Sequence, residues 1–399
     1  MKDMNHNYPR IILKPGRDRS IRHGHPWIFS GAVASVAGSP DPGGIALVVS
    51  HDNEPLALGF FNDRSDIRFR MLTRCVDVPV DESFWAHRIR SAAALRRQIV
   101  PPGTTAWRLI NAEGDGLPGL IVDRYGEDLV IAIATAGIEK HRAAILDQLQ
   151  RICHPARIYE RSDGRARQRE GLEDRIGPAM GDLPAAPLVI TENHLRFEVD
   201  IIAGQKTGFF LDQRDNRERM GDLGRGAAVL NCFSYTGGFS VYCARGGASR
   251  VVSVETSASA NDMARRNLAL NGFSPEAHPV IQADVFQYLR KTDDSFDLII
   301  LDPPSFAKSG KDVVRASRGY KDINLQAIRR LREGGLLATF SCSNYIGEAL
   351  FEKIVLGAAR DAARTAQKIA RLGAGSDHPV LLAHPEGLYL KGLLLRMES

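Results

Sequence analysis

The sequence reads AAVLNCF at residues 227–233, RVVSVET at 250–256, PVIQAD at 279–284, FDLIILD at 296–302 and LLATFSCS at 336–343. Each run is short and apolar, as a buried strand would be. Helix-like segments lie between them, such as SASANDMARRNLALNG, which opens with serines and ends in Asn-Gly, typical start and stop signals. This alternation predicts an α/β domain with a parallel, doubly wound sheet.

In an open sheet of this kind, ligands bind beyond the carboxyl ends of the strands. The first predicted strand runs into small residues, which let a ligand approach the backbone and let a helix begin close to the sheet. The spacing is not GxGxxG, so a dinucleotide fingerprint is weak, and a tight strand-to-helix turn explains an isolated Gly-Gly equally well. The candidate ligand-binding residues of this turn are Phe233, Ser234, Tyr235, Thr236, Gly237 and Gly238.

Acidic residues end the next two predicted strands. Glu255 comes about 20 residues after the turn, where a carboxylate is placed to accept hydrogen bonds from ribose hydroxyls. The alternative for Glu255 is a solvated carboxylate that favours the start of a helix. Asp284 ends the third strand, where it could reach an adenine amino group. A turn and two acids in this order suggest a cofactor that contains adenosine.

The fourth and fifth predicted strands end in residues that suit a nucleobase. Asp302 is followed by two prolines, which hold the chain extended and present the carboxylate at the sheet edge. Such a site can hydrogen-bond the polar edge of a base, and a rigid turn is the alternative. Cys342 ends the neighbouring strand, and a thiolate there can add to C6 of a pyrimidine and make C5 nucleophilic. The alternative for Cys342 is a small structural residue.

A basic segment follows Asp302. Residues 305–332 carry eight lysines and arginines against two aspartates, a net charge of +6 beside the expected site. Their location favours contacts with phosphates, and solvated surface charge is the alternative. The eight residues are Lys308, Lys311, Arg315, Arg318, Lys321, Arg329, Arg330 and Arg332.

Composition limits the class of protein. The chain has 399 residues, of which 44% are hydrophobic and 25% charged, values typical of a globular protein with two or three domains. No run approaches 18 consecutive apolar residues, and the N-terminus lacks the apolar core of a secretory signal. The five cysteines are odd in number and contain no CxxC pair, which disfavours both a disulfide framework and a metal site. We therefore expect a cytoplasmic protein, with a net charge of +5 that permits an anionic partner.

The residues before the predicted sheet show other patterns of strands and helices. Residues 11–72 read as short strands cut by turns, which predicts a small β-barrel or sandwich. A helix over 81–100 and strand-like runs that follow predict a small α+β unit, with residues 164–187 as a loop. At the other end of the chain, PVLLAHP and YLKGLLLRM are expected to form an antiparallel strand pair that closes the sheet.

Taken together, the motifs resemble the ribosomal RNA large subunit methyltransferase I family, the cytosine-C5 enzymes of 23S rRNA. Residues 13–33 (LKPGRDRSIRHGHPWIFSGAV), with GFFNDRSDIRFRML, resemble the family's PUA RNA-binding domain, and RLINAEGDGLPGLIVDRYG and IYERSDGRARQREGL its middle domain. GQKTGFFLDQRDNR, LNCFSYTGGFSV, LDPPSFAKS, FSCS and HPEGLYLKG resemble its catalytic domain. The resemblance implies a PUA β-barrel over 1–78, a small α+β domain over 79–200 and a class I (Rossmann-like) methyltransferase domain over 201–399.

The resemblance also implies a cofactor, a partner and roles for the candidate residues. The cofactor would be S-adenosyl-L-methionine, held by the turn at 233–238, with Glu255 on ribose and Asp284 near adenine. Asp302 would line the same site and recognise the cytosine edge, and Cys342 would attack C6. Many related enzymes carry a second cysteine where this chain has Ser305, so product release must proceed without it. Lining the same cleft would be Lys206, Asp212 and Arg214.

The expected partner is 23S rRNA, naked or in an assembling large subunit, with no membrane and with a homodimer as a further expectation. One rival hypothesis is a nitrogen methyltransferase acting on a guanine or adenine of rRNA, which would need no cysteine. Enzymes of that kind usually have an aromatic residue directly after Asp-Pro-Pro, whereas Ser305 precedes Phe306 here. Another rival is an RNA-binding module with a vestigial methyltransferase fold, which would not bind the cofactor.

Overall fold

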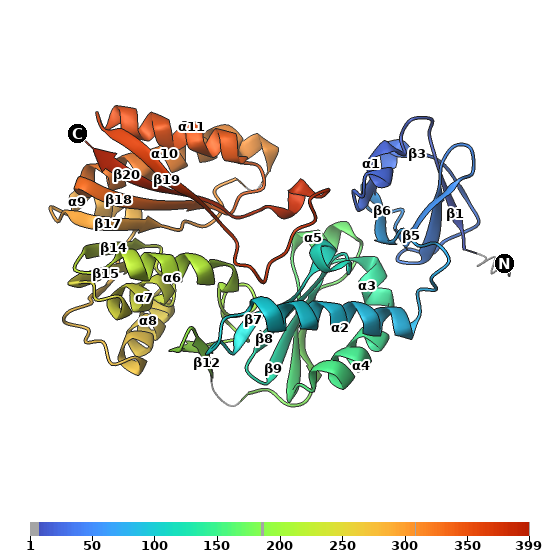
Figure 1. Ribbon diagram of the computed structural model, residues 1–399, viewed down its shortest axis with the longest axis horizontal. Helices are drawn as coiled ribbons and strands as arrows, with labels where there is room; N and C mark the ends of the chain where they lie inside the picture. Colours follow the sequence, from blue (N-terminus) through green and yellow to red (C-terminus); the bar gives the residue numbers. More distant parts are fainter. Residues whose placement is uncertain (1–7, 185–186, 308, 399) are drawn as a thin grey trace.

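The computed structural model describes residues 8–184, 187–307 and 309–398, which form three successive sheet-based units (Figure 1). The first unit is a six-stranded sheet in the order β2-β6-β5-β4-β1-β3, in which β1 runs parallel to β4 and every other pair is antiparallel. Its elements are β1 (Arg10–Leu13), α1 (Arg19–Arg22), β2 (Trp27–Phe29), β3 (Val33–Ala37), β4 (Ile45–Val49), β5 (Pro55–Phe61) and β6 (Ile67–Thr73).

The second unit is a five-stranded sheet in the order β11-β10-β9-β8-β7. Helices α2 and α4 pack against it, and their apolar residues share one core with the strands. Asp81 starts α2 by accepting hydrogen bonds from the backbone N–H groups of Ser83 and Phe84. The elements are α2 (Glu82–Ile99), β7 (Ala106–Asn111), β8 (Leu120–Tyr125), β9 (Asp128–Ile133), α3 (Ala136–Lys140), α4 (Arg142–Cys153), β10 (Arg157–Ser162), α5 (Arg165–Arg169) and β11 (Arg175–Met180).

A two-stranded hairpin, β12 (Leu188–Glu192) and β13 (Leu195–Val199), leads into the third unit. Its residues Ile190, Leu195, Phe197 and Val199 are buried in the core of the third unit, and β13 packs on α8 (Ala258–Leu270) of that unit. The hairpin thus belongs by packing to the C-terminal unit, although the sequence places it before residue 200.

The third unit is a seven-stranded sheet in the order β16-β15-β14-β17-β18-β20-β19. The first five strands are parallel, whereas β20 and β19 are antiparallel to their neighbours. Its strands are β14 (Ala228–Cys232), β15 (Arg250–Glu255), β16 (Val280–Gln282), β17 (Phe296–Leu301), β18 (Leu331–Ser341), β19 (Thr365–Gly373) and β20 (Lys391–Glu398). Its helices are α6 (Arg214–Leu223), α7 (Gly238–Arg245), α8 (Ala258–Leu270), α9 (Val285–Lys291), α10 (Val313–Arg330) and α11 (Glu348–Asp361).

Helices cover both faces of this sheet. Apolar residues of α6, α7 and α8 share one buried core with it, and those of α9, α10 and α11 share a second core. The central strands β14 and β17 are therefore buried on both sides, which explains their continuous apolar sequence. This is the doubly wound α/β sheet that the alternation predicts.

Two expectations about local structure are wrong. The strand that pairs with β20 is β19 at residues 365–373, and residues 379–385 form no strand. Pro379 and Pro385 flank that segment, and proline cannot donate a ladder hydrogen bond. Within residues 164–187, expected to be a loop, the structure instead has α5 and β11.

The segment of residues 374–390, here called the junction loop, connects β19 to β20 by way of the other two units (Figure 1). Asn111 of the second unit donates to the carbonyl of Pro379, 2.9 Å away. His384 contacts Trp27 of the first unit, with ring centroids 4.4 Å apart. The loop therefore ties the seven-stranded sheet to both preceding units. Among the described residues, no helix is long and apolar enough to cross a membrane.

Candidate active site

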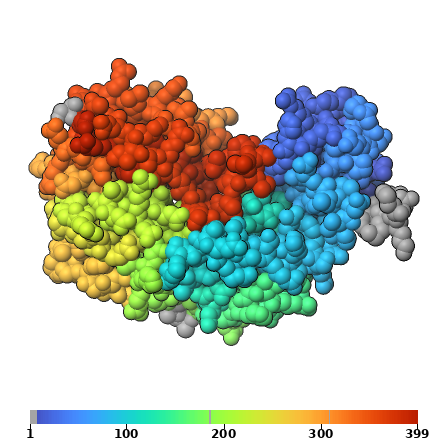
Figure 2. All heavy atoms as spheres, viewed as in Figure 1, coloured from blue at the N-terminus to red at the C-terminus, as the bar shows by residue number. Residues whose placement is uncertain are grey.

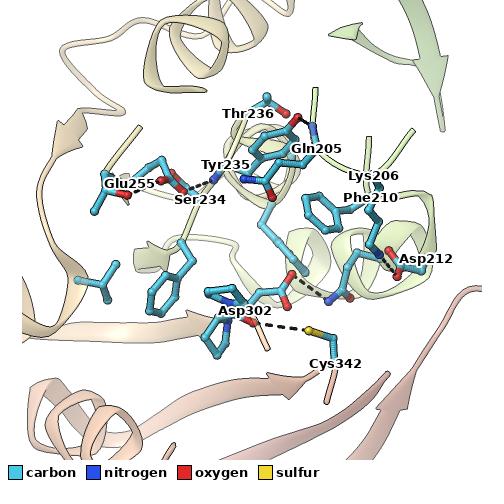
Figure 3. A pocket seen from close by; sticks show the side chains of 18 of the residues that line it. Gln205, Lys206, Phe210, Asp212, Ser234, Tyr235, Thr236, Glu255, Asp302 and Cys342 are labelled. Carbon is cyan, nitrogen blue, oxygen red and sulfur yellow. Dashed lines mark hydrogen bonds and ion pairs between the residues drawn. The ribbon is translucent and has the colours of Figure 1, made fainter. Parts of the chain in front are cut away.

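A cavity of about 420 Å³ opens at the carboxyl ends of the parallel strands (Figure 3). This volume lies in the range of small-molecule sites, and the position is where an open α/β sheet binds ligands. Most of the residues expected from the sequence line it together. They are Lys206, Asp212, Phe233, Ser234, Tyr235, Thr236, Gly238, Glu255, Asp284, Asp302 and Cys342.

The turn after β14 has an unusual backbone. Phe233 and Tyr235 have φ of 58° and 45°, and Gly237 has φ of 80°. A Cβ on Gly237 would also lie 3.0 Å from the Cβ of Ala264, so glycine is required by both conformation and space. The Tyr235 hydroxyl accepts from the backbone N–H of Gln205 at 2.9 Å and fixes this turn to the segment before the sheet. Gly237 itself shapes the turn rather than lining the cavity.

Two buried hydroxyls in this turn have no hydrogen-bond partner in the described part of the chain. Ser234 and Thr236 are 6% and 2% exposed, line the cavity, and leave Oγ and Oγ1 unsatisfied. Buried polar atoms normally find partners, because an unsatisfied one costs about 1–3 kcal/mol. This arrangement therefore fits a polar ligand that supplies the missing partners.

The two strand-end acids face the cavity with part of their hydrogen-bonding capacity in use. Glu255 accepts from the backbone N–H groups of Tyr235, Thr256 and Ser257. Asp284 caps α9, with one oxygen accepting from the N–H of Gln287 at 2.9 Å. Asp284 is thus a helix-capping carboxylate as well as a cavity residue, whereas Glu255 ends β15 and Ser257 caps the helix that follows.

An aromatic wall stands beside the two acids. The ring centroid of Phe286 lies 6.5 Å from that of Phe233 and 6.0 Å from that of Phe306. All three side chains line the cavity, together with Val285. Such an apolar surface next to Asp284 suits a flat heteroaromatic ring, which stacks on aromatic side chains.

The other end of the cavity holds a charged cluster. Lys206 Nζ lies 2.6 Å from Oδ2 of Asp212, and the Tyr389 hydroxyl donates to the same oxygen at 2.5 Å. Burial by itself would raise the pKa of Asp212, but the Lys206 ammonium and its other partners hold that pKa well below the usual range. Oδ1 of Asp212 is buried without a partner, so this carboxylate keeps an acceptor for a ligand.

Asp302 and Cys342 lie next to this cluster, at the ends of β17 and β18. Strand register brings them together, because Leu301 pairs with Thr339 in parallel β17 and β18. Cys342 Sγ lies 4.0 Å from the carbonyl oxygen of Pro303, the residue after Asp302. Asp302 accepts a hydrogen bond from Gln213 at 3.0 Å.

Both groups hold their protons more firmly than usual. Burial, together with the nearby Asp212 carboxylate, raises the pKa of Asp302 to about 7. Burial and the Asp302 carboxylate also raise the pKa of the Cys342 thiol, while Lys206 lowers it. The cavity therefore offers a carboxyl group that titrates near neutral pH beside a thiol, and a cation close to both.

Comparison with known proteins shows the family of this chain. The family described as PUA-like domain matches residues 11–74, and the S-adenosylmethionine-dependent methyltransferase family matches residues 145–396. A ribosomal RNA large subunit methyltransferase I from Shewanella amazonensis is 45% identical over 392 residues, covering 97% of this chain and 99% of the relative. The enzyme of the same name from Salmonella arizonae is 44% identical, covering 98% of both chains. The chain belongs to the ribosomal RNA large subunit methyltransferase I family.

Solved structures agree with this fold. A methyltransferase complexed with S-adenosylhomocysteine (SAH) has a TM-score of 0.85 and 22% identity, covering 97% of this chain and 99% of the other. An S-adenosylmethionine-dependent methyltransferase from Streptococcus mutans has a TM-score of 0.83 at the same identity and coverage. The predicted fold class is confirmed, a class I methyltransferase sheet with an N-terminal PUA-like domain. The cofactor is S-adenosylmethionine, and the unsatisfied hydroxyls, free acceptors and aromatic wall of the cavity fit it.

One residue expected in the cleft of this methyltransferase lies elsewhere. Arg214 is fully buried and forms an ion pair with Asp377 of the junction loop at 3.1 Å. It does not line the cavity, because it begins α6 and its side chain turns toward Ser376 and Asp377 of the junction loop. Its neighbour Gln213 and, one helical turn further on, Arg217 line the cavity in its place.

Several lining residues were not predicted. Gln205, Phe209 and Phe210 belong, like Gln213, to the stretch GQKTGFFLDQRDNR, so the motif itself was the available signal. Leu390 lies at the end of the junction loop, and Phe286 lies on α9 beyond Asp284. These side chains approach the cavity from segments outside the strand ends, which is why a search of strand ends misses them.

The basic segment 305–332 does not lie wholly beside the cavity. Helix α10 begins at the cavity edge and ends at Arg330, at the opposite edge of the sheet, where Arg330 donates to the carbonyl of Leu289. Arg332 pairs with Asp297, the second residue of β17. Only the first half of the segment is therefore near the site, and Lys308 lies outside the described residues.

Proposed function

We propose that this enzyme transfers a methyl group from S-adenosylmethionine to C5 of a cytosine in 23S rRNA. The observation that carries the proposal is a thiol, Cys342, beside a carboxyl group, Asp302, in the cofactor cavity. The names of the relatives support large-subunit rRNA as the substrate. We further propose that the enzyme acts in the cytoplasm, and that a second copy of the chain is its partner in a homodimer.

The cavity residues suggest how the cofactor lies. In this proposal the Ser234 and Thr236 hydroxyls take up hydrogen bonds with it, and Glu255 accepts from the ribose hydroxyls. The adenine ring lies on Phe286 with its amino group toward Asp284. Asp212 Oδ1, which lacks a partner, accepts from the amino group of the methionine part, because that group is a cation. S-adenosylmethionine, when bound, supplies an electrophilic methyl group on a sulfonium.

Cys342 begins the proposed reaction. Its thiol loses a proton to the Asp302 carboxylate, and the thiolate sulfur bonds to C6 of the cytosine, which shifts the π electron pair of the C5–C6 double bond to C5. Lys206 stabilises the thiolate, since it lowers the pKa of Cys342. Asp302, with a pKa of about 7, can donate to N3 of the cytosine when protonated and accept from the N4 amino group. C5 would then take the methyl group, and the sulfur of the cofactor would keep the electron pair of the broken sulfur–methyl bond.

Release of the product completes the cycle. A base removes the proton from C5, the C5–C6 double bond forms again, and the sulfur–C6 bond breaks to return the thiolate. Ser305 is directed away from this step, since its hydroxyl donates to the carbonyl of Ala307 at 3.0 Å. Asp302, Lys206 and Asp212 are described titratable residues that line the cavity and act electrostatically on Cys342.

The test is nucleoside mass analysis of 23S rRNA treated with the enzyme and labelled S-adenosylmethionine. We expect label in 5-methylcytidine, and none with Cys342→Ala. Cys153→Ala is the matched control, because Cys153 is a half-buried cysteine of the second unit. Label in a methylated purine, or full activity of Cys342→Ala, would contradict the proposal and favour nitrogen methylation.

A second experiment tests the covalent step. RNA that carries 5-fluorocytidine has no proton to lose at C5, so the Cys342 adduct should persist after methylation. We expect a protein–RNA band on a denaturing gel with the unaltered enzyme and with Cys153→Ala. The absence of that band, under conditions where unfluorinated RNA is methylated, would exclude the adduct.

A further inference from the structure

We propose that the second unit of this enzyme binds the RNA backbone beside the target nucleotide. Arg161 would hold a phosphate in a cavity next to the active site, and Arg165 and Arg169 of α5 would continue the contact. This inference rests on the proposed RNA substrate. It assigns a role to the motif IYERSDGRARQREGL, which the reaction itself leaves unexplained.

The cavity measures about 270 Å³ and lies between the second and third units. Arg108 and Arg161 come from the second unit, whereas Lys206, Thr207 and Tyr389 come from the third. Lys206 also lines the catalytic cavity, so the two cavities share a lining side chain. A strand whose target base enters the catalytic cavity would therefore have a flanking phosphate within reach of this second cavity.

Three basic side chains line this cavity, and two of them are paired with a carboxylate. Arg108 forms an ion pair with Asp123 at 2.8 Å, and Lys206 is paired with Asp212. Arg161 has no ion pair among the described residues, and its Nε is buried without a hydrogen-bond partner. Its Nη1 donates to the carbonyl of Gly204 at 2.5 Å, which holds the guanidinium at the mouth of the active site.

An uncompensated guanidinium suits a phosphate. Arginine offers five N–H donors in a planar fork that matches phosphate oxygens, and the Nε–H of Arg161 has no hydrogen-bond partner among the described residues. Asp163 on the same rim is exposed and carries the opposite charge, so it reduces the net attraction without occupying the guanidinium. Contacts to phosphate are the main source of affinity for nucleic acids and position the strand.

Helix α5 extends the basic surface. Arg165 and Arg169 are exposed and unpaired within the described residues, while Arg167 between them is buried and paired with Glu139 at 2.7 Å. The buried pair anchors the helix and leaves the other two arginines in solvent. In Figure 1, α5 lies on the side of the second unit that faces the PUA-like unit and the junction loop. Figure 2 shows a notch there, between the blue N-terminal unit and the red C-terminal segment.

The experiment measures binding of transcribed 23S rRNA over a range of salt concentrations. Each lost phosphate contact lowers the slope of log K against log salt by about 0.7–0.9. We expect Arg161→Gln to lower the slope by about one contact, and the triple variant R161Q/R165Q/R169Q by two to three. Arg161→Lys keeps the charge and should keep the slope. Arg151→Gln, a change to an exposed arginine on α4, is the matched control and should leave the slope unchanged.

A purely structural role for Arg161 gives a different result. If Arg161 only holds Gly204, Arg161→Gln should weaken S-adenosylmethionine binding or lower the melting temperature while the salt slope stays as in the unaltered enzyme. That result, or an equal loss of slope in Arg151→Gln, would overturn the proposal. Nucleoside analysis of the same RNA reports separately on the proposed reaction, since the slope does not depend on which base is methylated.

Discussion

At the scale of single residues, replacing two buried serines of the catalytic unit by alanine should change stability in opposite directions. Ser234 Oγ has no partner among the described residues, whereas Ser253 Oγ lies 2.7 Å from Ser240 Oγ. In the absence of cofactor, Ser234→Ala should raise the free energy of unfolding by about 1 kcal/mol, because it removes a buried hydroxyl that has no partner. The same change should weaken S-adenosylmethionine binding about tenfold, because the hydroxyl bonds only the cofactor. Urea unfolding and calorimetry measure the two effects. Ser253→Ala, the control, should lower stability and leave affinity unchanged, and equal affinity in both variants would argue against the assigned role.

Asp302 makes a pH-dependent contribution to stability. Its pKa is about 7 in the folded protein and about 4 in an unfolded chain, so between these values the folded state holds a proton that the unfolded state has released. The free energy of unfolding therefore falls as pH rises through this window. Asp302→Asn removes the effect. The free energy of unfolding of this variant, minus that of the unaltered enzyme, should therefore rise by roughly 1–3 kcal/mol from pH 5 to pH 8. Urea unfolding at both pH values measures it.

The control for this prediction is Asp262→Asn. Asp262 is largely exposed and belongs to a surface ion pair with Arg265 on α8. Its removal should shift stability equally at the two pH values, because exposed pairs contribute little. A difference between Asp302→Asn and the unaltered enzyme that stays constant with pH would show that Asp302 is already ionised at pH 5.

At the scale of elements, the sequence predicts well what lies at the strand ends. Glu255, Asp284, Asp302 and Cys342 each follow a strand whose apolar run is evident, and parallel strands bring these ends to one edge. Contacts across long separations are not encoded in local periodicity. Tyr389 reaches Asp212 from 177 residues away, and it comes from a loop whose apolar residues resemble a strand.

The junction loop depends on one buried carboxylate. Asp377 is fully buried and accepts from the backbone N–H of Arg108 at 2.8 Å and from Arg214 at 3.1 Å. Asp377→Asn would leave the Arg214 charge buried without its principal partner, which should cost about 3 kcal/mol of unfolding free energy. Urea unfolding measures this loss.

Asp361→Asn is the comparison for this element. Asp361 is half exposed and pairs with Lys321 at 2.7 Å on the surface, so its loss should cost less than about 1 kcal/mol. Equal costs for the two variants would show that Arg214 finds compensation elsewhere, for example from Asp215 at 3.2 Å.

At the scale of the whole molecule, two buried glutamates join the PUA-like unit to the second unit. Glu113 accepts from Trp27 Nε1 at 2.8 Å and pairs with Arg70 at 3.2 Å. Glu170 pairs with the same arginine at 3.0 Å and accepts from Asn62 at 2.8 Å. These contacts set the angle between the PUA-like unit and the second unit, beside which the notch in Figure 2 lies.

The double variant E113A/E170A should loosen that angle. We expect a larger radius of gyration in small-angle X-ray scattering and rRNA binding weakened about tenfold, because an RNA that spans two units must then restrict their motion. Binding of S-adenosylmethionine should not change, since neither glutamate lines its cavity. Glu276→Ala, on the surface of the catalytic unit, is the control. It should alter neither the radius of gyration nor the binding of rRNA or S-adenosylmethionine. Unchanged rRNA affinity in a loosened double variant would mean that one unit alone supplies the binding energy.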